Sequence, residues 1–198
     1  MSERGRRRLS LAISEGDGIS VLVEVVDSRA AGAAEEQGAD GIVVRTAAPA
    51  VRDATDLPIL WCSDGPDAAD AAGADACLLV ADAYREDWER LADDNERGLA
   101  LGLDSVVEVR DEEELQATLE HVDPEIFLLS GRGAEADEEE LERVLDLLPD
   151  VPAGKLAIAE LSVRGREEVA ALERAGIDAV IVASDSVLEL LGGVPPGV

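Results

Sequence analysis

The sequence predicts a compact (β/α)8 barrel built as a single domain. Short apolar runs alternate with segments of helical periodicity along the chain. The apolar runs are continuous, which is typical of parallel strands that are covered on both faces. Several helical segments end in a Gly, one further residue and an Asp before the next apolar run, as at Gly38–Asp40, Gly73–Asp75 and Gly176–Asp178. This repeated unit indicates a βα architecture.

Eight segments have the length and composition of buried strands. They are Ile19–Val25, Gly41–Arg45, Pro58–Cys62, Ala76–Val80, Ser105–Val109, Ile126–Leu129, Leu156–Ala159 and Ala179–Val182. Eight parallel strands can close into a barrel, which favours this fold over the alternative, an open doubly wound sheet. With 198 residues, the barrel would be a small one of its kind.

Seven segments between or after the strands have helical periodicity. They are Ser28–Gln37, Pro66–Ala72, Arg85–Leu101, Glu112–His121, Asp137–Leu148, Arg166–Ala175 and Ser186–Leu190. Asp111 and Asp137 are suited to cap two of these helices, with Glu114 and Glu140 three residues further on. The connection between Thr46 and Leu57 is too short for much helix.

Residues 1–18 form an N-terminal arm in this interpretation, and the domain comprises residues 1–198. Two apolar stretches, Leu9–Ile13 and Ile19–Val25, flank the turn-forming residues Glu15-Gly16-Asp17-Gly18. This pattern predicts a β-hairpin. Its first arm could be an extra N-terminal strand that plugs or edges the bottom of the barrel.

The charge balance excludes several classes of partner. The chain has 45 acidic and 17 basic residues, a net charge of -28, and the excess is spread over every segment. Phosphates would be repelled, so we expect no nucleic acid and no membrane as a partner. No apolar run approaches the roughly 20 residues of a membrane helix, and we expect a cytoplasmic location. We interpret the acidic surface as an adaptation to high salt, with an acidic partner-binding face as the alternative.

The cysteines and the histidine do not form a metal-binding pattern. Cys62, Cys77 and His121 lack the close spacing of zinc ligands. Both cysteines lie in apolar strand segments, where a thiol behaves as a small core residue. We therefore expect core thiols, no zinc site and no cofactor.

Two stretches of the chain carry a family resemblance. Leu101–Arg132 and Ile158–Val182 resemble indole-3-glycerol phosphate synthase of tryptophan biosynthesis, and the similarity extends from about Leu57 to Val187. The resemblance implies a TIM barrel. In such barrels the active site lies at the carboxyl ends of the strands, so a small-molecule ligand is expected at this mouth.

The resemblance also implies a set of site residues at the strand ends. The glutamates of the family's first, fifth and seventh strands match Glu24, Glu108 and Glu160, which are the candidate catalytic residues. The candidate substrate-binding residues are Arg132, Ser130, Ser162 and Ser184. Arg132 is the expected counter-charge for the glutamates.

The family's two catalytic lysines have no counterpart here. Val26 and Cys62 stand at their positions, and Lys155 lies elsewhere. Closing the indole ring requires decarboxylation and dehydration, for which a lysine donates a proton and holds the anionic substrate. On the eighth strand, Ala183 replaces the family's phosphate-binding glycine. We therefore expect a binding or structural barrel without authentic synthase activity.

Two enzymatic alternatives remain at this point. The first is an active indole-3-glycerol phosphate synthase, or a related lyase, that uses Glu108, Arg132 and Glu160. The second is a carboxylate- or metal-based enzyme of new specificity, because clustered carboxylates can hold Mg²⁺ or Ca²⁺.

Overall fold

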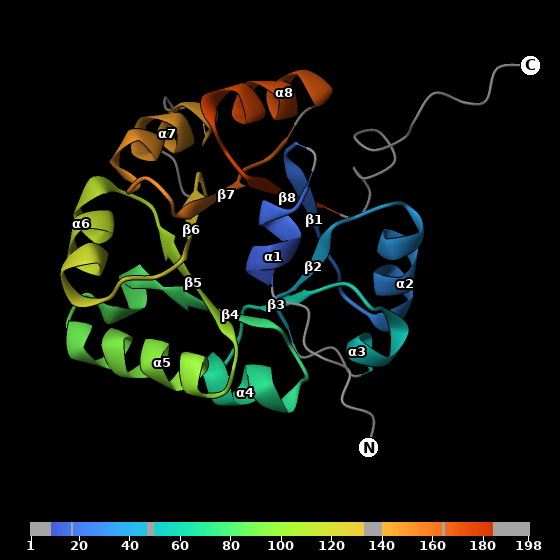
Figure 1. Cartoon of the computed structure of the whole chain (residues 1–198), viewed down its shortest axis with the longest axis horizontal. Helices are drawn as coiled ribbons and strands as arrows, with labels where there is room; N and C mark the ends of the chain where they lie inside the picture. Colours follow the sequence, from blue (N-terminus) through green and yellow to red (C-terminus); the bar gives the residue numbers. More distant parts are fainter. Residues whose placement is uncertain (1–8, 17, 47–49, 133–139, 164, 184–198) are drawn as a thin grey trace, which may run out of the picture.

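Eight parallel strands form a closed barrel in the computed structural model, which describes residues 9–16, 18–46, 50–132, 140–163 and 165–183. The strands are β1 (Ser20–Glu24), β2 (Gly41–Val44), β3 (Ile59–Trp61), β4 (Ala76–Val80), β5 (Asp104–Val109), β6 (Ile126–Ser130), β7 (Leu156–Glu160) and β8 (Ala179–Ala183). Each strand pairs with the next, and β8 pairs with β1 from Ser20 opposite Ala179 to Glu24 opposite Ala183. The (β/α)8 TIM barrel is therefore confirmed and the open sheet is excluded (Figure 1).

Most helices cover the outside of the barrel (Figure 1). They are α1 (Leu9–Ser14), α2 (Ser28–Glu36), α3 (Val51–Ala54), α4 (Gly65–Ala71), α5 (Trp88–Ala100), α6 (Glu112–His121), α7 (Glu140–Leu147) and α8 (Arg166–Ala175), with short 3-10 helices at Ala81–Tyr84 and Leu148–Asp150. The single turn of α3 agrees with the short connection after β2. The expected cap Asp137 and the expected helix Ser186–Leu190 lie outside the described residues. Within those residues, no helix is long and apolar enough to cross a membrane.

Helix α1 takes the place of the expected hairpin. Leu9 and Ile13 are four residues apart, so a helix brings them to one face, and both are buried in the barrel interior. The backbone N–H of Ser10 donates to Asp104 Oδ2 at 2.8 Å, at the start of β5. The extra N-terminal strand and the hairpin are therefore wrong, whereas the location at the barrel bottom is correct. Figure 1 shows α1 lying across the centre of the ring of strands.

Helix α5 begins later than the sequence predicts. Asp87 is its N-cap, and its side chain accepts the N–H of Arg90 at 3.2 Å. Arg85 therefore precedes the helix, and its guanidinium binds Glu114 Oε1 at 2.7 Å and Asp111 Oδ2 at 2.9 Å. Asp111 also caps α6 as expected, by accepting the N–H of Glu114.

The aspartates that precede strands have a common structural role. Each carboxylate accepts a backbone N–H from the start of the preceding strand. The pairs are Asp40 with Val21 at 2.8 Å, Asp75 with Ile59 at 2.9 Å and Asp178 with Ala157 at 2.8 Å. These charge-assisted bonds satisfy strand N–H groups at the bottom of the barrel and help to set the position of neighbouring strands.

Side chains alternate between the barrel interior and the layer beneath the helices. Each strand contributes an apolar residue to one interior cluster: Leu22, Val43, Leu60, Leu78, Val106, Leu128, Ile158 and Ile181. The intervening residues, such as Val21 and Val23, pack against the helices. Because strand side chains have a period of two, the residues two positions beyond this cluster face the carboxyl-terminal mouth.

Candidate functional site

Alternation along the strands defines the inner surface of the mouth. We call the residues two positions beyond the interior cluster the mouth ring: Glu24, Arg45, Cys62, Val80, Glu108, Ser130, Glu160 and Ala183. All three candidate catalytic glutamates belong to it, and each comes from an odd-numbered strand. In a TIM barrel, alternate strands contribute the side chains of one layer, which accounts for the position of these three carboxylates at the same level of the barrel.

Glu160 is the most constrained member of the mouth ring. Glu160 is only 2% exposed to solvent. One carboxylate oxygen accepts Ser130 Oγ–H at 3.1 Å, and the other is bound by Arg132 Nε at 3.1 Å and by Arg45 Nη2. A buried carboxylate remains ionised only when such partners replace its hydration.

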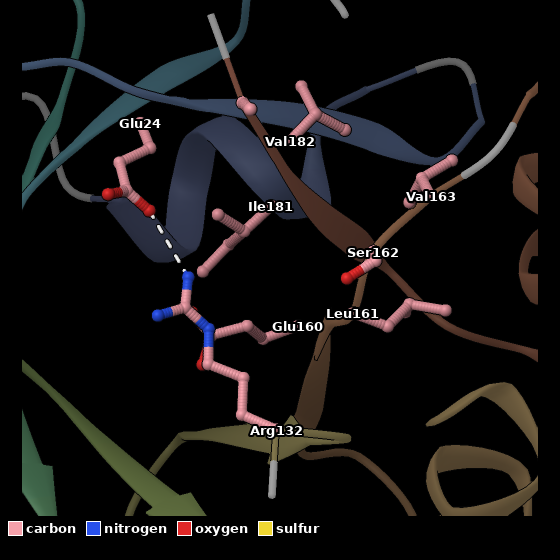
Figure 2. Close-up of a pocket in the computed structure, with 9 residues that line it drawn as sticks. Glu24, Arg132, Glu160, Leu161, Ser162, Val163, Ile181 and Val182 are labelled. Carbon is pink, nitrogen blue, oxygen red and sulfur yellow. Dashed lines mark hydrogen bonds and ion pairs between the residues drawn. The ribbon is translucent and has the colours of Figure 1, made fainter. Parts of the chain in front are cut away.

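Glu24 shares both arginines with Glu160. Arg45 Nε lies 2.9 Å from Glu24 Oε2, and Arg132 Nη2 lies 3.3 Å from the same oxygen. Two guanidinium groups thus bridge two carboxylates across the β1, β2, β6 and β7 ends of the mouth. Figure 2 shows Arg132 extending between Glu24 and Glu160. The expected role of Arg132 as a counter-charge is confirmed for these two glutamates.

Glu108 belongs to a separate ion-pair group. Its carboxylate is bound by Arg110 Nε at 3.0 Å and Nη2 at 2.9 Å, from the same strand end. Arg110 also lies 3.6 Å from Asp82 through its Nη1. The counter-charge of Glu108 is therefore Arg110 and not Arg132. The three glutamates do not form one carboxylate cluster.

Arg45 and Arg110 are charged residues of the candidate site that the family motifs do not mark. Arg45 follows the interior residue Val43 by two positions, and Arg110 follows Glu108 by two positions. Strand periodicity therefore places both arginines on the inner side of the barrel. This spacing of two residues along a strand is the feature of the sequence that predicts the position of the two arginines.

The thiol of Cys62 lies in the mouth ring, partly buried. Burial raises its pKa to about 12, Arg45 opposes this effect, and Glu108 and Glu24 add to it. The group is therefore a neutral thiol at neutral pH. Cys77 lies deeper, in β4, where burial raises its pKa to about 11. Cys77 thus matches the expected core thiol, whereas Cys62 faces the site.

A turn after β6 carries Arg132 to the mouth. The N–H of Gly131 donates to the carbonyl oxygen of Glu160 at 2.8 Å, which continues the pairing of β6 with β7. A Cβ atom on Gly131 would lie 2.8 Å from the carbonyl oxygen of Glu140, at the start of α7. Only glycine fits this close approach, and the next residue is thereby directed over the mouth.

A cavity of about 310 Å³ opens at the mouth, between β1, β7 and β8. Glu24, Glu160, Arg132 and Ser162 supply its polar lining, and apolar side chains including Ile181 complete it (Figure 2). Ser162 is held by its backbone N–H, which donates to Glu140 Oε2 at 2.6 Å. Ser184 lies outside the described residues.

The carboxylates of the mouth do not form a metal centre. Among the residues that the structure describes, no group of three or more His, Cys, Asp or Glu side chains is arranged to hold a metal ion. The partners of Glu24, Glu108 and Glu160 explain this, because each carboxylate is bound to the guanidinium group of an arginine.

The fold and the mouth define a TIM-barrel protein with a paired carboxylate and arginine site at the carboxyl ends of its strands. The sequence profile of the family "Indole-3-glycerol phosphate synthase" matches residues 66–188. The chain belongs to this family. The matched residues begin after β3, so the ends of β1, β2 and β3 lie outside the match.

Curated relatives agree with the family assignment. The chain is 38% identical over 116 residues to indole-3-glycerol phosphate synthase of Variovorax paradoxus strain S110, which covers 57% of this chain and 41% of the relative. It is 36% identical over 142 residues to the synthase of Acidithiobacillus ferrooxidans, which covers 67% of this chain and 51% of the relative. The chain thus spans about half the length of the curated relatives it matches.

Solved structures are similar in fold. The N-acetylmannosamine-6-phosphate 2-epimerase of Clostridium perfringens superposes with a TM-score of 0.69 at 14% identity, covering 92% of both chains. The thiamine phosphate pyrophosphorylase of Pyrococcus furiosus superposes with a TM-score of 0.64 at 19% identity, covering 93% of both chains. At these identities the likeness concerns the barrel alone.

Proposed function

We propose that this barrel binds a small molecule at its mouth and does not catalyse the synthase reaction. The observation that carries the proposal is the identity and pairing of the cations in the mouth. The described mouth contains arginines, and Arg45 and Arg132 are both bound to Glu24 and Glu160. Lys155, the lysine of the chain, precedes β7 at the opposite end of the barrel and binds Asp123.

The chemistry of these groups supports the proposal. The family's lysines supply a transferable proton and a positive charge at the reacting centre. An arginine supplies the charge but retains its proton, because its pKa exceeds about 12. Cys62, which the sequence resemblance aligns with one lysine, is a neutral thiol with a pKa of about 12. Val26, which the resemblance aligns with the other lysine, is 72% exposed and has no proton to transfer.

The charge of the mouth also opposes the binding of a sugar phosphate. Each arginine near the cavity already neutralises a glutamate, so an incoming phosphate would have to displace a carboxylate. A compact ligand with few charges fits the 310 Å³ cavity and its mixed polar and apolar lining better.

An active lyase is the second candidate, because Glu108, Arg132 and Glu160 match the family pattern. In that case Glu160 or Glu108 would have to act as proton donor without a lysine. A carboxylate-based enzyme of new specificity would need one of the same glutamates released from its arginine. The pairing described above is the reason for preferring a binding function to both.

The deciding experiment is a synthase assay that follows formation of indole-3-glycerol phosphate, performed in molar salt. We expect no product from the wild-type chain above the level of a Glu160→Gln variant. Product that disappears with Glu160→Gln but remains with Arg29→Ala, a change on the exposed side of α2, would overturn the proposal.

A binding measurement separates loss of catalysis from loss of recognition. Thermal unfolding is followed during titration with indole-3-glycerol phosphate, with inorganic phosphate as the control. We expect no specific rise in the melting temperature at millimolar concentrations. A rise of several degrees that Arg132→Ala abolishes would show that the mouth still recognises the family's ligand.

A further inference from the structure

The ion pair between Arg132 and Glu24 uses only part of the hydrogen-bonding capacity of the two side chains. Arg132 Nη2 lies 3.3 Å from Glu24 Oε2, and Arg132 Nε lies 3.1 Å from Glu160 Oε1. The third guanidinium nitrogen, Nη1, and the other oxygen, Glu24 Oε1, have no partner among the residues that the structure describes. The same ion pair therefore still offers N–H donors on one side chain and a carboxylate acceptor on the other.

Both side chains are accessible to a ligand. Arg132 and Glu24 line the cavity of about 310 Å³, and their side chains are 53% and 31% exposed. Glu160 is buried, and its two oxygens are already bound by Ser130, Arg132 and Arg45. A ligand in the cavity would thus meet Arg132 and Glu24, while Glu160 holds the guanidinium group of Arg132 in position.

A hydroxyl group adds a further donor inside the cavity. Ser162 is exposed, and its backbone N–H is bound to Glu140. Figure 2 shows its hydroxyl directed toward the inside of the group of lining side chains. Within the part of the chain that the structure describes, this hydroxyl has no hydrogen-bond partner, so it is available to a ligand.

The charge balance of this part of the mouth selects among ligands. Arg45 and Arg132 are bound to Glu24 and Glu160, so the network of two cations and two anions has no net charge. An anion would be attracted by Arg132 but repelled by both glutamates, and the reverse holds for a cation. A zwitterion can pair each of its charges with the opposite charge of the site. Because Arg132 and Glu24 are in contact, the two charged groups of the ligand must be close together, as they are in an α-amino acid.

The apolar part of the lining indicates a short aliphatic side chain. Val163 is partly buried and Ala183 is exposed, so both have accessible surface, whereas Leu161 and Ile181 are 8% and 4% exposed. The accessible apolar wall is therefore small. None of the described residues that line the cavity is aromatic.

We propose that the mouth binds a small aliphatic α-amino acid as its zwitterion. The carboxylate of the ligand accepts hydrogen bonds from Arg132 and Ser162, and its ammonium group donates to Glu24 Oε1. Its side chain contacts Val163 and Ala183. This inference rests on the proposed binding function and names the ligand class for it.

The test is a titration of the full-length chain with L-valine, followed by amide chemical shifts. Molar potassium chloride suppresses non-specific attraction of cations to the acidic surface. Two matched controls each lack one charged group, since 3-methylbutanoate has no ammonium group and isobutylammonium has no carboxylate. We expect saturable shifts at the ends of β6 and β7 with L-valine, and dissociation constants at least about tenfold higher for both controls. Equal affinity for L-valine and either control would overturn the proposal.

Variants then test the two charged contacts. Glu24→Gln removes the negative charge at nearly unchanged volume, and Arg132→Gln removes the positive charge. We expect each to raise the dissociation constant of L-valine at least about tenfold. Glu36→Gln, the same chemical change on the exposed side of α2, should leave it unchanged. Thermal unfolding in the same salt checks that each variant is folded. Unaltered binding in both Glu24→Gln and Arg132→Gln would place the amino acid elsewhere and overturn the proposal.

Failure of this inference can be distinguished from failure of the proposed function. No saturable shift with L-valine, together with no synthase product, would overturn the amino-acid ligand and leave a binding function in place. Synthase product that depends on Glu160 would overturn the proposed function, and with it the amino-acid ligand.

Discussion

Arg45 is the residue on which the charge balance of the mouth depends. Its guanidinium bridges Glu24 and the buried Glu160, and its side chain is 22% exposed. We predict that Arg45→Met destabilises the protein by about 2–4 kcal/mol, because Glu160 loses a partner while it stays buried. Urea unfolding in high salt measures the change in the free energy of unfolding.

The matched control is Arg29→Met on α2, where the side chain is exposed and no ion pair is described. A surface arginine of this kind contributes little to stability. In the double variant Arg45→Met with Glu160→Gln, part of the lost stability should return, since the unpaired charge is gone. If Arg45→Met and Arg29→Met destabilise equally, the mouth network has no structural role.

Cys77 provides a prediction about alkaline pH. Burial raises the pKa of its thiol to about 11, so the folded state holds the proton more tightly than the unfolded state, whose thiol titrates near 9.0. This stabilisation is complete below pH 9 and is lost as the pH rises toward 11. The slope reaches up to about 1.4 kcal/mol per pH unit for this one group.

The measurement is the free energy of unfolding between pH 8 and pH 11 for the wild type and for Cys77→Ala. The variant should be less stable at pH 8 and should lose less stability as the pH rises. The wild type and the variant share Tyr84, whose pKa burial also raises, so the main contribution of Tyr84 cancels in the difference between them. Parallel curves would contradict the prediction.

The glutamates of the mouth could be predicted from the sequence, whereas their partners could not. Glu24, Glu108 and Glu160 were identified through family motifs, which mark strand ends. Arg45 is not part of any such motif, and its pairing with Glu160 joins residues 115 positions apart. A contact of that range depends on barrel closure, so the sequence alone indicates a face of the strand and not a partner.

At the scale of secondary-structure elements, α1 is the clearest case in which a local pattern has two interpretations. An apolar stretch of five residues fits a short strand or one and a half turns of helix, and its period cannot be established over so few residues. The tertiary environment decides, because the bottom of the barrel offers an apolar opening for one helical face and an acceptor, Asp104, for the N–H of Ser10.

The plug formed by α1 should contribute strongly to stability. Leu9 is 0% exposed and packs with Leu22 and other interior residues, whereas Leu11 in the same helix is 51% exposed. We predict that Leu9→Ala destabilises the barrel by about 3 kcal/mol, because it leaves a cavity in the core. Leu11→Ala should change stability by less than about 0.5 kcal/mol. Similar effects of the two substitutions would mean that α1 does not seal the barrel in solution.

The strands were easier to predict than the helices, and the reason is physical. Parallel strands in a barrel are buried on both faces, so their apolar runs are continuous and bounded by polar residues. All eight expected strands are present, with ends that agree or differ by one residue. Helix starts depend on individual caps. Asp87 sets the start of α5 through one hydrogen bond. Arg85 is a residue type that is common in helices, yet it lies before the start of α5.

At the scale of the whole molecule, the net charge of -28 dominates the electrostatics. Acidic residues exceed basic ones by 45 to 17, so most surface carboxylates repel others of the same sign. This repulsion destabilises the compact state, and salt screens it. We propose that the protein is adapted to work at high salt, where the screening length is short.

Stability should therefore rise steeply with salt concentration. The Debye length falls from about 30 Å at 0.01 M to about 3 Å at 1 M, so repulsion between separate surface carboxylates is largely removed. The buried pairs of the mouth are screened much less, and they should persist over the same range. The melting temperature measured from 0.01 M to 2 M potassium chloride is expected to increase most below about 0.5 M.

A parallel series with sucrose at matched osmolality separates screening from the general stabilisation that excluded solutes provide. Charge screening predicts a larger increase with the salt than with sucrose, and a smaller increase at low pH, where the carboxylates are protonated. A melting temperature that stays flat or falls with salt would remove the high-salt interpretation. The acidic surface would then be better explained as a face that binds a basic partner. Such a face serves binding, so it does not require the stability of the free protein to rise with salt.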